Sequence, residues 1–301
     1  MLAIIIPYYK FDFFEATLQS LANQTDKRFN VYIGDDASTE DCSGLLNKFS
    51  GKFNFNYHRF DTNLGGENLT GQWERCIGLI GGEEWIMLLG DDDVLSDNVV
   101  ECFYNNSGSC KAAGSNVVRY ASKVINSNGE EYLGPFLHPE LESASGFYLR
   151  KIKGQTRSSL SEYVFKKDIV NKYHFTNYPL AWHSDDKACL DFSENKPIFS
   201  INEAIVFVRF SEVNISGRKD NTELKLKATN LFFQDILNRE KTVFCKNQIL
   251  QLLLKYEEIV KRERKLTLNE WKFLFFSYLS NFNFLTFLKF IRRFFISFLK
   301  S

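Results

Sequence analysis

The sequence predicts an α/β protein with a Rossmann-like, doubly wound, mostly parallel sheet and a helical C-terminal extension. Two observations indicate this fold class. Short apolar runs alternate with segments whose apolar residues recur at helical spacing, as in proteins built from βαβ units. From Thr222 onward the apolar spacing is helical to the end of the chain. We therefore expect one domain over residues 1–220, with halves at about 1–97 and 98–220, and a helical region over 221–301.

The N-terminal elements repeat a strand–helix pattern. Apolar runs over 2–7 and 29–34 read as strands, and apolar residues at helical spacing over 12–24 predict the crossover helix between them. The pattern then repeats. We expect a helix around 45–49, a strand over 53–60, a helix over 71–80, a strand over 85–89 and a helix over 97–104.

The second half is less regular in sequence. Clusters of Gly, Ser and Asn over 105–160 predict long loops around a strand or two. An ordered run resumes at 163–165, a helix is expected over 186–193, and 198–210 reads as a strand or a hairpin.

The composition excludes several classes of protein. The chain has 301 residues, of which 44% are hydrophobic and 25% charged, which is the profile of an ordinary folded protein and not of a disordered, collagen-like or coiled-coil chain. No apolar stretch of membrane-spanning length and no leader segment are evident, so we expect neither secretion nor a membrane span. The six cysteines form no C-x-x-C pair, which favours a reducing cytosol.

Five carboxylates directly follow two of the predicted strands. They are Asp35, Asp36, Asp91, Asp92 and Asp93. Ligands of doubly wound sheets bind beyond the carboxyl ends of the strands, so these side chains should share one rim. Clustered acids repel unless a cation is present, and Mg²⁺ or Mn²⁺ is commonly held by one or two carboxylates plus phosphates. The alternative is a pair of solvated turns in which Asp or Ser caps the next helix.

Three motifs in this region keep a fixed order over residues 3–97. They are Ile4-Ile5-Ile6-Pro7-Tyr8-Tyr9, Val31-Tyr32-Ile33-Gly34-Asp35-Asp36-Ala37-Ser38-Thr39 and Leu89-Gly90-Asp91-Asp92-Asp93-Val94-Leu95. A fourth is Asn63-Leu64-Gly65 followed by Arg75 and Gly78, with Cys76 where Asn is usual. Together they resemble family 2 glycosyltransferases, which have the GT-A fold.

The resemblance implies a nucleotide site in residues 1–97. Its members would be Pro7, Tyr8, Tyr9, Asp35, Asp36, Asn63, Gly65, Arg75 and Asp91. Tyr8 or Tyr9 would pack on the base and Asp35 or Asp36 would accept from its ring N–H, a pairing that suits a uracil imide. Without the resemblance, strand-edge packing explains the tyrosines and a surface helix charge explains Arg75.

The resemblance also implies a divalent cation, Mn²⁺ or Mg²⁺, at the third motif. The family's element is Asp-x-Asp-Asp, and alignment on Val94-Leu95 puts Gly90 where the first Asp would stand. Asp92 then occupies the metal-ligand position. Asp93 could join it, and Asp91 could hold the ribose or a metal-bound water.

For the second half, the resemblance implies an acceptor site at residues 182–187. Asp186 would be the base that deprotonates the acceptor hydroxyl, with Asp185 beside it, and Trp182 would be an acceptor-side platform. His183 is the local competitor as base, and helix capping is the structural alternative. Four residues farther on could neutralise the leaving group, although a solvated basic loop explains them equally well: Arg209, Ser216, Arg218 and Lys219.

The C-terminal tail has a different character. Residues 259–301 carry a formal charge of +7, which leaves −7 on residues 1–258, and 271–301 contain no Asp or Glu. Dense Phe and Leu with interspersed Lys and Arg suit a helix lying on an anionic membrane surface. The alternatives are docking on the enzyme core or a homodimer contact.

The sequence thus predicts an inverting, metal-dependent transferase that moves a sugar from a nucleotide-sugar donor, UDP-linked by the family's habit, to a lipid-linked or surface glycan. We expect it in the cytoplasm, on the inner face of the cell membrane. Two alternatives remain: a nucleotidyltransferase that makes nucleotide-sugars, and a membrane-surface scaffold with the fold but no turnover. Dinucleotide oxidoreduction is disfavoured because no G-x-G-x-x-G follows a strand.

Overall fold

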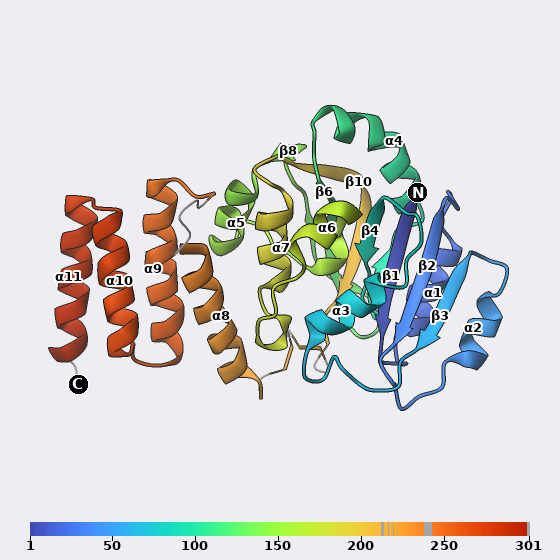
Figure 1. The fold of residues 1–301 in the computed structure, drawn as a ribbon, viewed down its shortest axis with the longest axis horizontal. Coiled ribbons are helices and arrows are strands. Elements are labelled where there is room, and N and C mark those ends of the chain that lie inside the picture. Colours follow the sequence, from blue (N-terminus) through green and yellow to red (C-terminus); the bar gives the residue numbers. More distant parts are fainter. Residues whose placement is uncertain (212–213, 216, 219, 238–242, 300–301) are drawn as a thin grey trace. The chain divides into compact units, whose positions relative to one another are not determined.

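The computed structural model describes residues 1–211, 214–215, 217–218, 220–237 and 243–299 (Figure 1). It confirms the predicted fold class, an α/β protein with a central, mostly parallel sheet and C-terminal helices. The chain divides into two compact units, Met1–Lys225 and Leu226–Ser301. All of the predicted catalytic, nucleotide-binding and metal-binding residues belong to the first unit.

The N-terminal half of the sheet is parallel, as predicted. Four strands pair in the order β3-β2-β1-β4: β1 (Leu2–Tyr8), β2 (Phe29–Asp35), β3 (Phe55–Arg59) and β4 (Trp85–Leu88). The connecting helices are α1 (Phe14–Ala22), α2 (Ser43–Phe49) and α3 (Leu69–Ile77). Each predicted helix is present, with ends that differ by a few residues.

Helices cover both faces of this sheet, which makes it doubly wound. Leu2, Ile4 and Ile6 alternate along β1 and belong to a core with apolar residues of α1, α2 and α4 (Val99–Ala112). On the opposite face, α3 contacts β1 and β2. In Figure 1, α3 lies in front of the sheet and α1 behind it. Burial on both faces explains why the strands read as continuous apolar runs.

The expectation of long loops over 105–160 is wrong. Apart from α4, this stretch contains β6 (Val117–Ile125), β7 (Glu131–Phe136), β8 (Leu141–Glu142), α5 (Ala144–Ile152) and the single-turn helix η1 (Leu160–Glu162). The run Asn105-Asn106-Ser107-Gly108-Ser109, which suggested a loop, lies largely exposed in α4, whose inner residue Cys110 is buried. Tertiary packing overrides weak helix propensity there.

The rest of the first unit completes a mixed sheet. It contains β5 (Val94–Leu95), β9 (Tyr163–Lys166), α6 (Lys167–Tyr173), the single-turn helix η2 (Pro179–Ala181), α7 (Ser184–Phe192) and β10 (Ile198–Arg209). β9 inserts antiparallel between β4 and β6, and β10 runs parallel to β6. The segment 198–210 is one strand and not a hairpin.

The second unit is helical where the structure describes it, as predicted. α8 (Thr222–Leu237) crosses the boundary, followed by α9 (Lys246–Glu263), α10 (Leu268–Ser280) and α11 (Phe284–Leu299). A capping box between Thr267 and Glu270 starts α10, and Trp271, Tyr278 and Phe290 pack in the helical core. Among the described helices, none has the length and apolar character needed to cross a membrane.

Candidate active site

Strand register places the predicted N-terminal site residues at one edge of the sheet. Tyr8 pairs with Asp35, and Asp35 pairs with Arg59, so the carboxyl ends of β1, β2 and β3 lie side by side. β4 runs parallel to β1 with Ile5 opposite Leu88, which brings the acidic motif after β4 to the same edge. The topology therefore produces the rim that the sequence predicts.

Asp35 connects the ends of the strands and is fully buried. Its Oδ2 accepts hydrogen bonds from the Tyr57 hydroxyl (2.5 Å) and from Arg59 Nη1 (2.7 Å), and its Oδ1 accepts from the Ser38 amide (2.8 Å). Burial and the hydrogen bond to Asp35 raise the pKa of Tyr57 well above its usual value, so this tyrosine stays protonated and donates. Asp35 thus stabilises the β2–α2 turn.

Asp36 organises the loop before α3. It accepts from the amides of Leu64 (2.7 Å) and Gly65 (2.8 Å), and it forms an ion pair with Arg75. A Cβ at Gly65 would lie 2.6 Å from Asp36 Oδ2, so only glycine allows this approach. The guanidinium of Arg75 also lies over the Phe60 ring, 3.9 Å from its centroid.

The predicted nucleotide-site residues Asp36, Gly65 and Arg75 therefore lie together. Asn63, which was predicted with them, stays exposed and accepts a hydrogen bond from the Gly66 amide.

Cys76, the departure from the family's Asn, has a packing role. Its side chain is fully buried against Gly34, where a Cβ would lie 2.2 Å from Cys76 Sγ. Burial raises the pKa of the Cys76 thiol to about 12, which keeps it neutral at physiological pH. The absence of a side chain at Gly34 lets α3 approach β2 closely at Cys76, and the neutral thiol adds no charged group to the rim.

The two tyrosines after β1 differ in exposure. Tyr8 is fully buried, with its ring 4.5 Å from that of Phe14 between centroids. Tyr9 is 41% exposed at the rim, and Pro7 is partly exposed. Of the two, only Tyr9 presents a ring to a ligand, while Tyr8 supports the rim from beneath.

Asp91 fixes the loop after β1. Its Oδ2 accepts from the backbone amides of Tyr9 (2.8 Å) and Lys10 (2.7 Å). Burial and the adjacent charge of Asp92 raise the pKa of Asp91 to about 6. Asp91 therefore joins the β1–α1 loop to the acidic motif.

Asp93 joins the two halves of the first unit. It is 5% exposed, its Oδ2 accepts from the Ser161 hydroxyl (2.5 Å) and its Oδ1 accepts from the Arg209 amide (2.8 Å). The Gly90 amide donates to the same Ser161 oxygen (3.0 Å). Burial and the charge of Asp92 raise the pKa of Asp93 to about 7.

Asp92 is partly exposed, as is Asp91, whereas Asp93 is buried. Burial raises the pKa of Asp92. The positive charges of Lys10 and Arg209 and a hydrogen bond with Asn214 act in the opposite direction. A Cβ at Gly90 would lie 2.9 Å from Asp92 Oδ1, so the glycine that replaces the family's first Asp leaves room for this carboxylate.

These residues suit a hard cation only if a ligand completes the site. Among the described residues, no group of three or more His, Cys, Asp or Glu side chains is arranged to hold a metal ion. Asp91 and Asp93 are engaged with backbone and serine donors, so Asp92 is the carboxylate that would hold the ion. One carboxylate plus diphosphate and water oxygens is a common environment for Mg²⁺, so the donor chemistry fits.

The second predicted cluster lies at the start of α7. Asp186 is 1% exposed and forms an ion pair with Lys151 Nζ on α5 (2.5 Å), while His183 Nδ1 lies 2.8 Å from its other oxygen. Asp185 is partly exposed. His183 is the N-cap residue and both aspartates occupy the first turn, so neither aspartate caps the helix itself. The Trp182 ring is partly exposed, with Lys225 Nζ 5.0 Å from its centroid.

The segment before α7 packs on α3, the helix that carries Arg75. Glu74 accepts from the Phe175 amide (2.7 Å), Trp73 and Phe175 pack edge to face, and η2 contacts α3. The acceptor-side candidates at 182–186 are therefore attached to the same helix that positions the Asp36 side of the rim.

Four residues that contact predicted site residues were not themselves predicted: Lys10, Arg59, Lys151 and Ser161. Lys10 and Arg59 follow or end predicted strands, so position alone could have identified them. Lys151 and Ser161 lie in or beside the stretch misread as loops, and no local pattern marks them.

Arg209 does not behave as a free phosphate ligand. Its Nε donates to the Asp92 backbone oxygen (2.9 Å), and its Nη1 donates to the carbonyls of Asn126 (2.8 Å) and Ser127 (3.2 Å). Arg218 pairs with Asp220. Ser216 and Lys219 lie outside the described residues.

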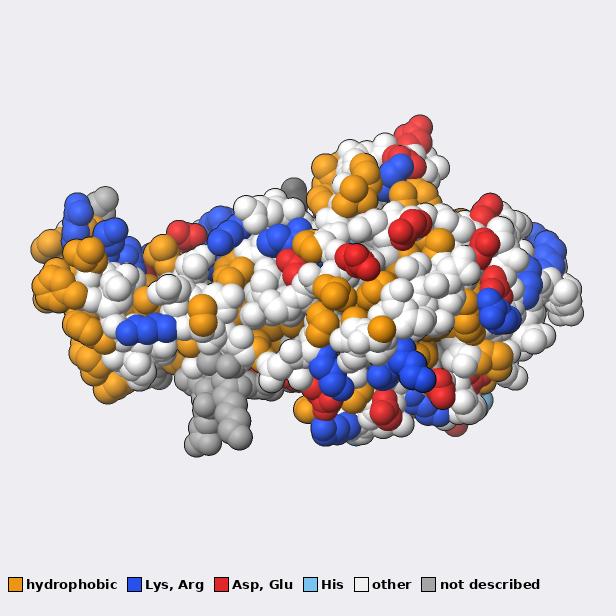
Figure 2. Space-filling model, turned by 90° about the horizontal axis from the view of Figure 1, so that it is seen from above, with side chains coloured by type: hydrophobic (Ala, Val, Ile, Leu, Met, Phe, Trp, Pro, Cys, Tyr) orange, Lys and Arg blue, Asp and Glu red, His pale blue; other side chains and the backbone are white. Residues whose placement is uncertain are grey.

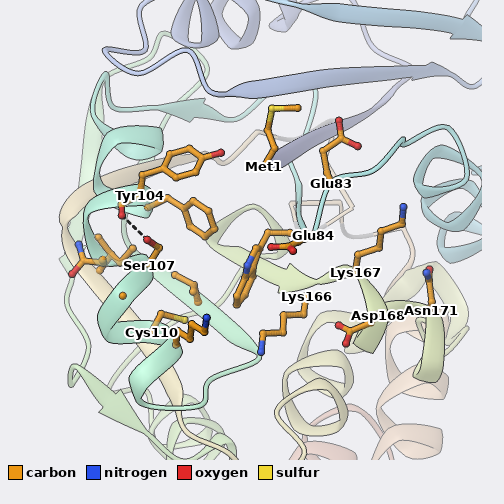
Figure 3. A pocket seen from close by; sticks show the side chains of 17 residues that line it. Met1, Glu83, Glu84, Tyr104, Ser107, Cys110, Lys166, Lys167, Asp168 and Asn171 are labelled. Carbon is orange, nitrogen blue, oxygen red and sulfur yellow. Dashed lines mark hydrogen bonds between the residues drawn. The ribbon is translucent and has the colours of Figure 1, made fainter.

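A separate cavity of about 780 Å³ lies at the opposite, amino end of the strands (Figure 3). Met1 and Glu84, which precede β1 and β4, contribute to its wall, together with Tyr104 and Lys166. None of the predicted site residues lines this cavity. Figure 3 shows that both carboxylates and lysine ammonium groups surround it.

Comparisons with known proteins bear on the family and the fold. The model of glycosyl transferase family 2 matches residues 3–161, more than half of the chain. No curated protein matches the sequence.

Solved structures resemble the fold at low identity. S. aureus TarS residues 1–349 in complex with UDP-GlcNAc superposes with a TM-score of 0.67 at 16% identity, covering 93% of this chain and 80% of that one. The complex with UDP gives 0.63 at 17%, covering 95% and 82%. S. aureus TarS gives 0.62 at 16%, covering 95% of this chain and 50% of that one. The chain belongs to glycosyl transferase family 2.

Proposed function

We propose that the protein is an inverting glycosyltransferase that moves a sugar from a UDP-sugar to a lipid-linked or surface glycan, with Mn²⁺ or Mg²⁺. The observation that carries the proposal is the rim itself, where the Asp36–Gly65–Arg75 loop and the acidic motif 91–93 meet the end of β1. Three adjacent carboxylates with raised pKa values at this edge of the sheet favour a functional site over a structural turn.

The nucleotide would lie against the ends of β1 and β2. Tyr9 offers an exposed ring for the base, and Pro7 borders it. Asp35 and Asp36 are buried and bonded to loop amides and cations, so either would accept from the imide N–H only after the rim opens to the base. UDP as the nucleotide is supported by the TarS complexes with UDP and UDP-GlcNAc, which share the fold. Asn63 and Asp91 border the ribose side in this proposal.

The diphosphate would lie over Asp92. The ion, when bound there, neutralises the charge that develops on the departing diphosphate. Asp93, held by Ser161, and Asp91, held by the β1–α1 loop amides, keep the Asp92 backbone in place. Lys10 lies beside the same carboxylates and would contribute positive charge toward the phosphates.

The acceptor would approach from the start of α7. The partly exposed Trp182 provides a flat apolar surface of the kind on which sugar rings pack, and His183 borders it. A carboxylate of the Asp185–Asp186 pair would take the proton of the acceptor hydroxyl as its oxygen attacks the anomeric carbon. Attack opposite the leaving diphosphate inverts the anomeric centre.

We also propose that the second unit holds the enzyme on the inner face of the cell membrane. Six large apolar side chains of α10 and α11 are at least 60% exposed: Leu268, Phe276, Phe284, Leu285, Phe295 and Leu299. Lys289 and Arg292 are exposed on the same helix as most of them. Figure 2 shows apolar side chains gathered beside Lys and Arg on this unit, at the left of the view. Such a face suits anionic lipid headgroups.

UDP release from UDP-sugars tests the proposed activity. The protein is incubated with UDP-hexoses and UDP-N-acetylhexosamines, with Mn²⁺ or EDTA, and liberated UDP is measured. We expect release from at least one donor that needs the ion and that falls at least 100-fold in Asp92→Asn. Pyrophosphate release from UTP and sugar 1-phosphates would instead support the nucleotidyltransferase, and no turnover of either kind would leave the scaffold.

A further inference from the structure

The two aspartates at the start of α7 are in unlike environments. Asp186 has both carboxylate oxygens engaged: Lys151 Nζ lies 2.5 Å from Oδ1, and His183 Nδ1 lies 2.8 Å from Oδ2. The side chain is 1% exposed, so a sugar hydroxyl could reach it only after these contacts break. The neighbouring Asp185 is partly exposed.

The protonation of the pair follows from these contacts. Burial alone would raise the pKa of Asp186. The charge of Lys151 and the contact with His183 outweigh burial and lower this pKa to about 2. Burial and the negative charge of Asp186 raise the pKa of Asp185. A carboxylate with a pKa near 2 is a poor proton acceptor, and one with a raised pKa is a better one.

The backbone that leads into α7 is held in a strained conformation. Leu180, Ala181 and His183 have φ angles of 60°, 52° and 72°, a left-handed region that residues with a side chain adopt only at an energetic cost. The left-handed turn at His183 directs its ring back to Asp186, three residues later. Non-glycine residues held this way are typical of sites where orientation matters.

From this geometry we propose that Asp185 is the catalytic base, and that Lys151 and Asp186 are positioning residues that hold and polarise it. The proposal rests on the proposed transferase function. The acceptor O–H bond breaks and its proton moves to an Asp185 oxygen. The acceptor oxygen forms the bond to the anomeric carbon, and the carbon–oxygen bond to the diphosphate breaks, with its electron pair leaving on UDP.

The charges around Asp185 make the assignment testable by pH. The charged groups that influence the pKa of Asp185 are Asp186 and His183 beside it and Lys151 on α5. Burial and the two aspartates raise the pKa values of Tyr148 on α5 and Cys189 on α7, so both stay protonated. Removal of the Lys151 cation should raise the proton affinity of Asp185. Removal of the Asp186 charge should lower it.

The experiment measures UDP release from UDP-GlcNAc or another accepted donor, with water as acceptor, as a function of pH. Asp185→Asn should lower kcat by ~100- to 10,000-fold, with partial rescue in Asp185→Glu. Lys151→Gln should move the acidic limb of the kcat profile to higher pH, and Asp186→Asn should move it to lower pH while turnover persists. Asp168→Asn, a first-turn carboxylate of α6, is the matched control.

Two results would overturn the assignment. Turnover that survives Asp185→Asn but disappears in Asp186→Asn would make Asp186 the base. Shifts of the acidic limb in the same direction in Lys151→Gln and Asp186→Asn would exclude the proposed polarisation. UDP affinity measured on each variant separates these outcomes from failure of the proposed function, in which the wild-type protein neither binds UDP nor releases it.

Discussion

At the scale of single residues, the rim is assembled by carboxylates that bind backbone amides. Asp36 accepts from the Leu64 and Gly65 amides, Asp91 from those of Tyr9 and Lys10, and Asp93 from that of Arg209. Charge-assisted bonds of this kind are stronger than neutral ones. These three carboxylates therefore fix the loops around the rim, and Asp92 is the carboxylate that we propose for ligand binding.

Gly65→Ala tests whether the contact between Asp36 and the loop before α3 matters for stability and nucleotide binding. The new Cβ would lie 2.6 Å from Asp36 Oδ2, so the loop must move away from Asp36 and Arg75. We expect the free energy of unfolding to fall by ~1–2 kcal/mol and UDP binding to weaken about tenfold or more, measured by denaturant unfolding and calorimetry.

Gly44→Ala is the control for that substitution. A Cβ at Gly44, in α2, meets no atom within 4 Å, so stability should hold or rise slightly and UDP affinity should not change. Equal UDP affinity in Gly65→Ala and Gly44→Ala would mean that the Asp36 loop takes no part in nucleotide binding.

At the scale of elements, the segment leading into α7 combines strain with attachment to α3. Its residues 180–183 contain three positive φ angles, and its start is fixed to Glu74 and Trp73 of α3. An arrangement that costs conformational energy persists only where the surroundings enforce it. This attachment links the acceptor side of the proposed site to its nucleotide side.

Ala181→Gly should relieve part of that strain. Glycine adopts a φ of 52° without steric cost, so we expect the melting temperature to stay unchanged or rise. Ala112→Gly, at an exposed position of α4 with ordinary helical geometry, should cost ~0.5–1 kcal/mol. Thermal unfolding of both variants decides the matter, and an equal loss in the two would argue against the strained conformation.

The sequence predicts the elements of the first half well and those of the second half poorly, for a physical reason. β1, β2 and β4 are buried on both faces and read as apolar runs, and the acids that follow them mark the rim. Between 105 and 160, α4 is mostly exposed and its Asn, Ser and Gly residues resemble a loop. Lys151 and Ser161 meet the predicted aspartates only through tertiary contacts.

At the scale of the whole molecule, charge and apolar surface separate along the chain. Residues 1–258 carry −7 and residues 259–301 carry +7. In the second unit, Phe290 packs inward on Trp271 and Tyr278, and Arg293 pairs with the buried Glu257, which leaves Lys289 and Arg292 outward. This amphipathic division of α11 is the basis for the proposed membrane contact.

Vesicle binding tests that contact. The full chain should sediment with phosphatidylserine-containing vesicles and less with neutral ones, and Lys289→Glu with Arg292→Glu should weaken binding by ~10- to 100-fold. Lys246→Glu with Lys265→Glu changes the charge of the same unit equally and should have little effect. No preference for anionic vesicles, with a dimer in sedimentation analysis, would assign the apolar face to a second copy of the chain.

The central claim is that the rim binds a uridine nucleotide through a cation held at Asp92. The measurement that tests it most directly is titration calorimetry of UDP, GDP and CDP with Mn²⁺ and with EDTA, on the wild-type protein and on Asp92→Asn. The account predicts UDP binding that exceeds GDP and CDP binding and is lost with EDTA or in Asp92→Asn. Failure of every nucleotide to bind the wild-type protein, or UDP binding indifferent to both the ion and Asp92, would contradict it.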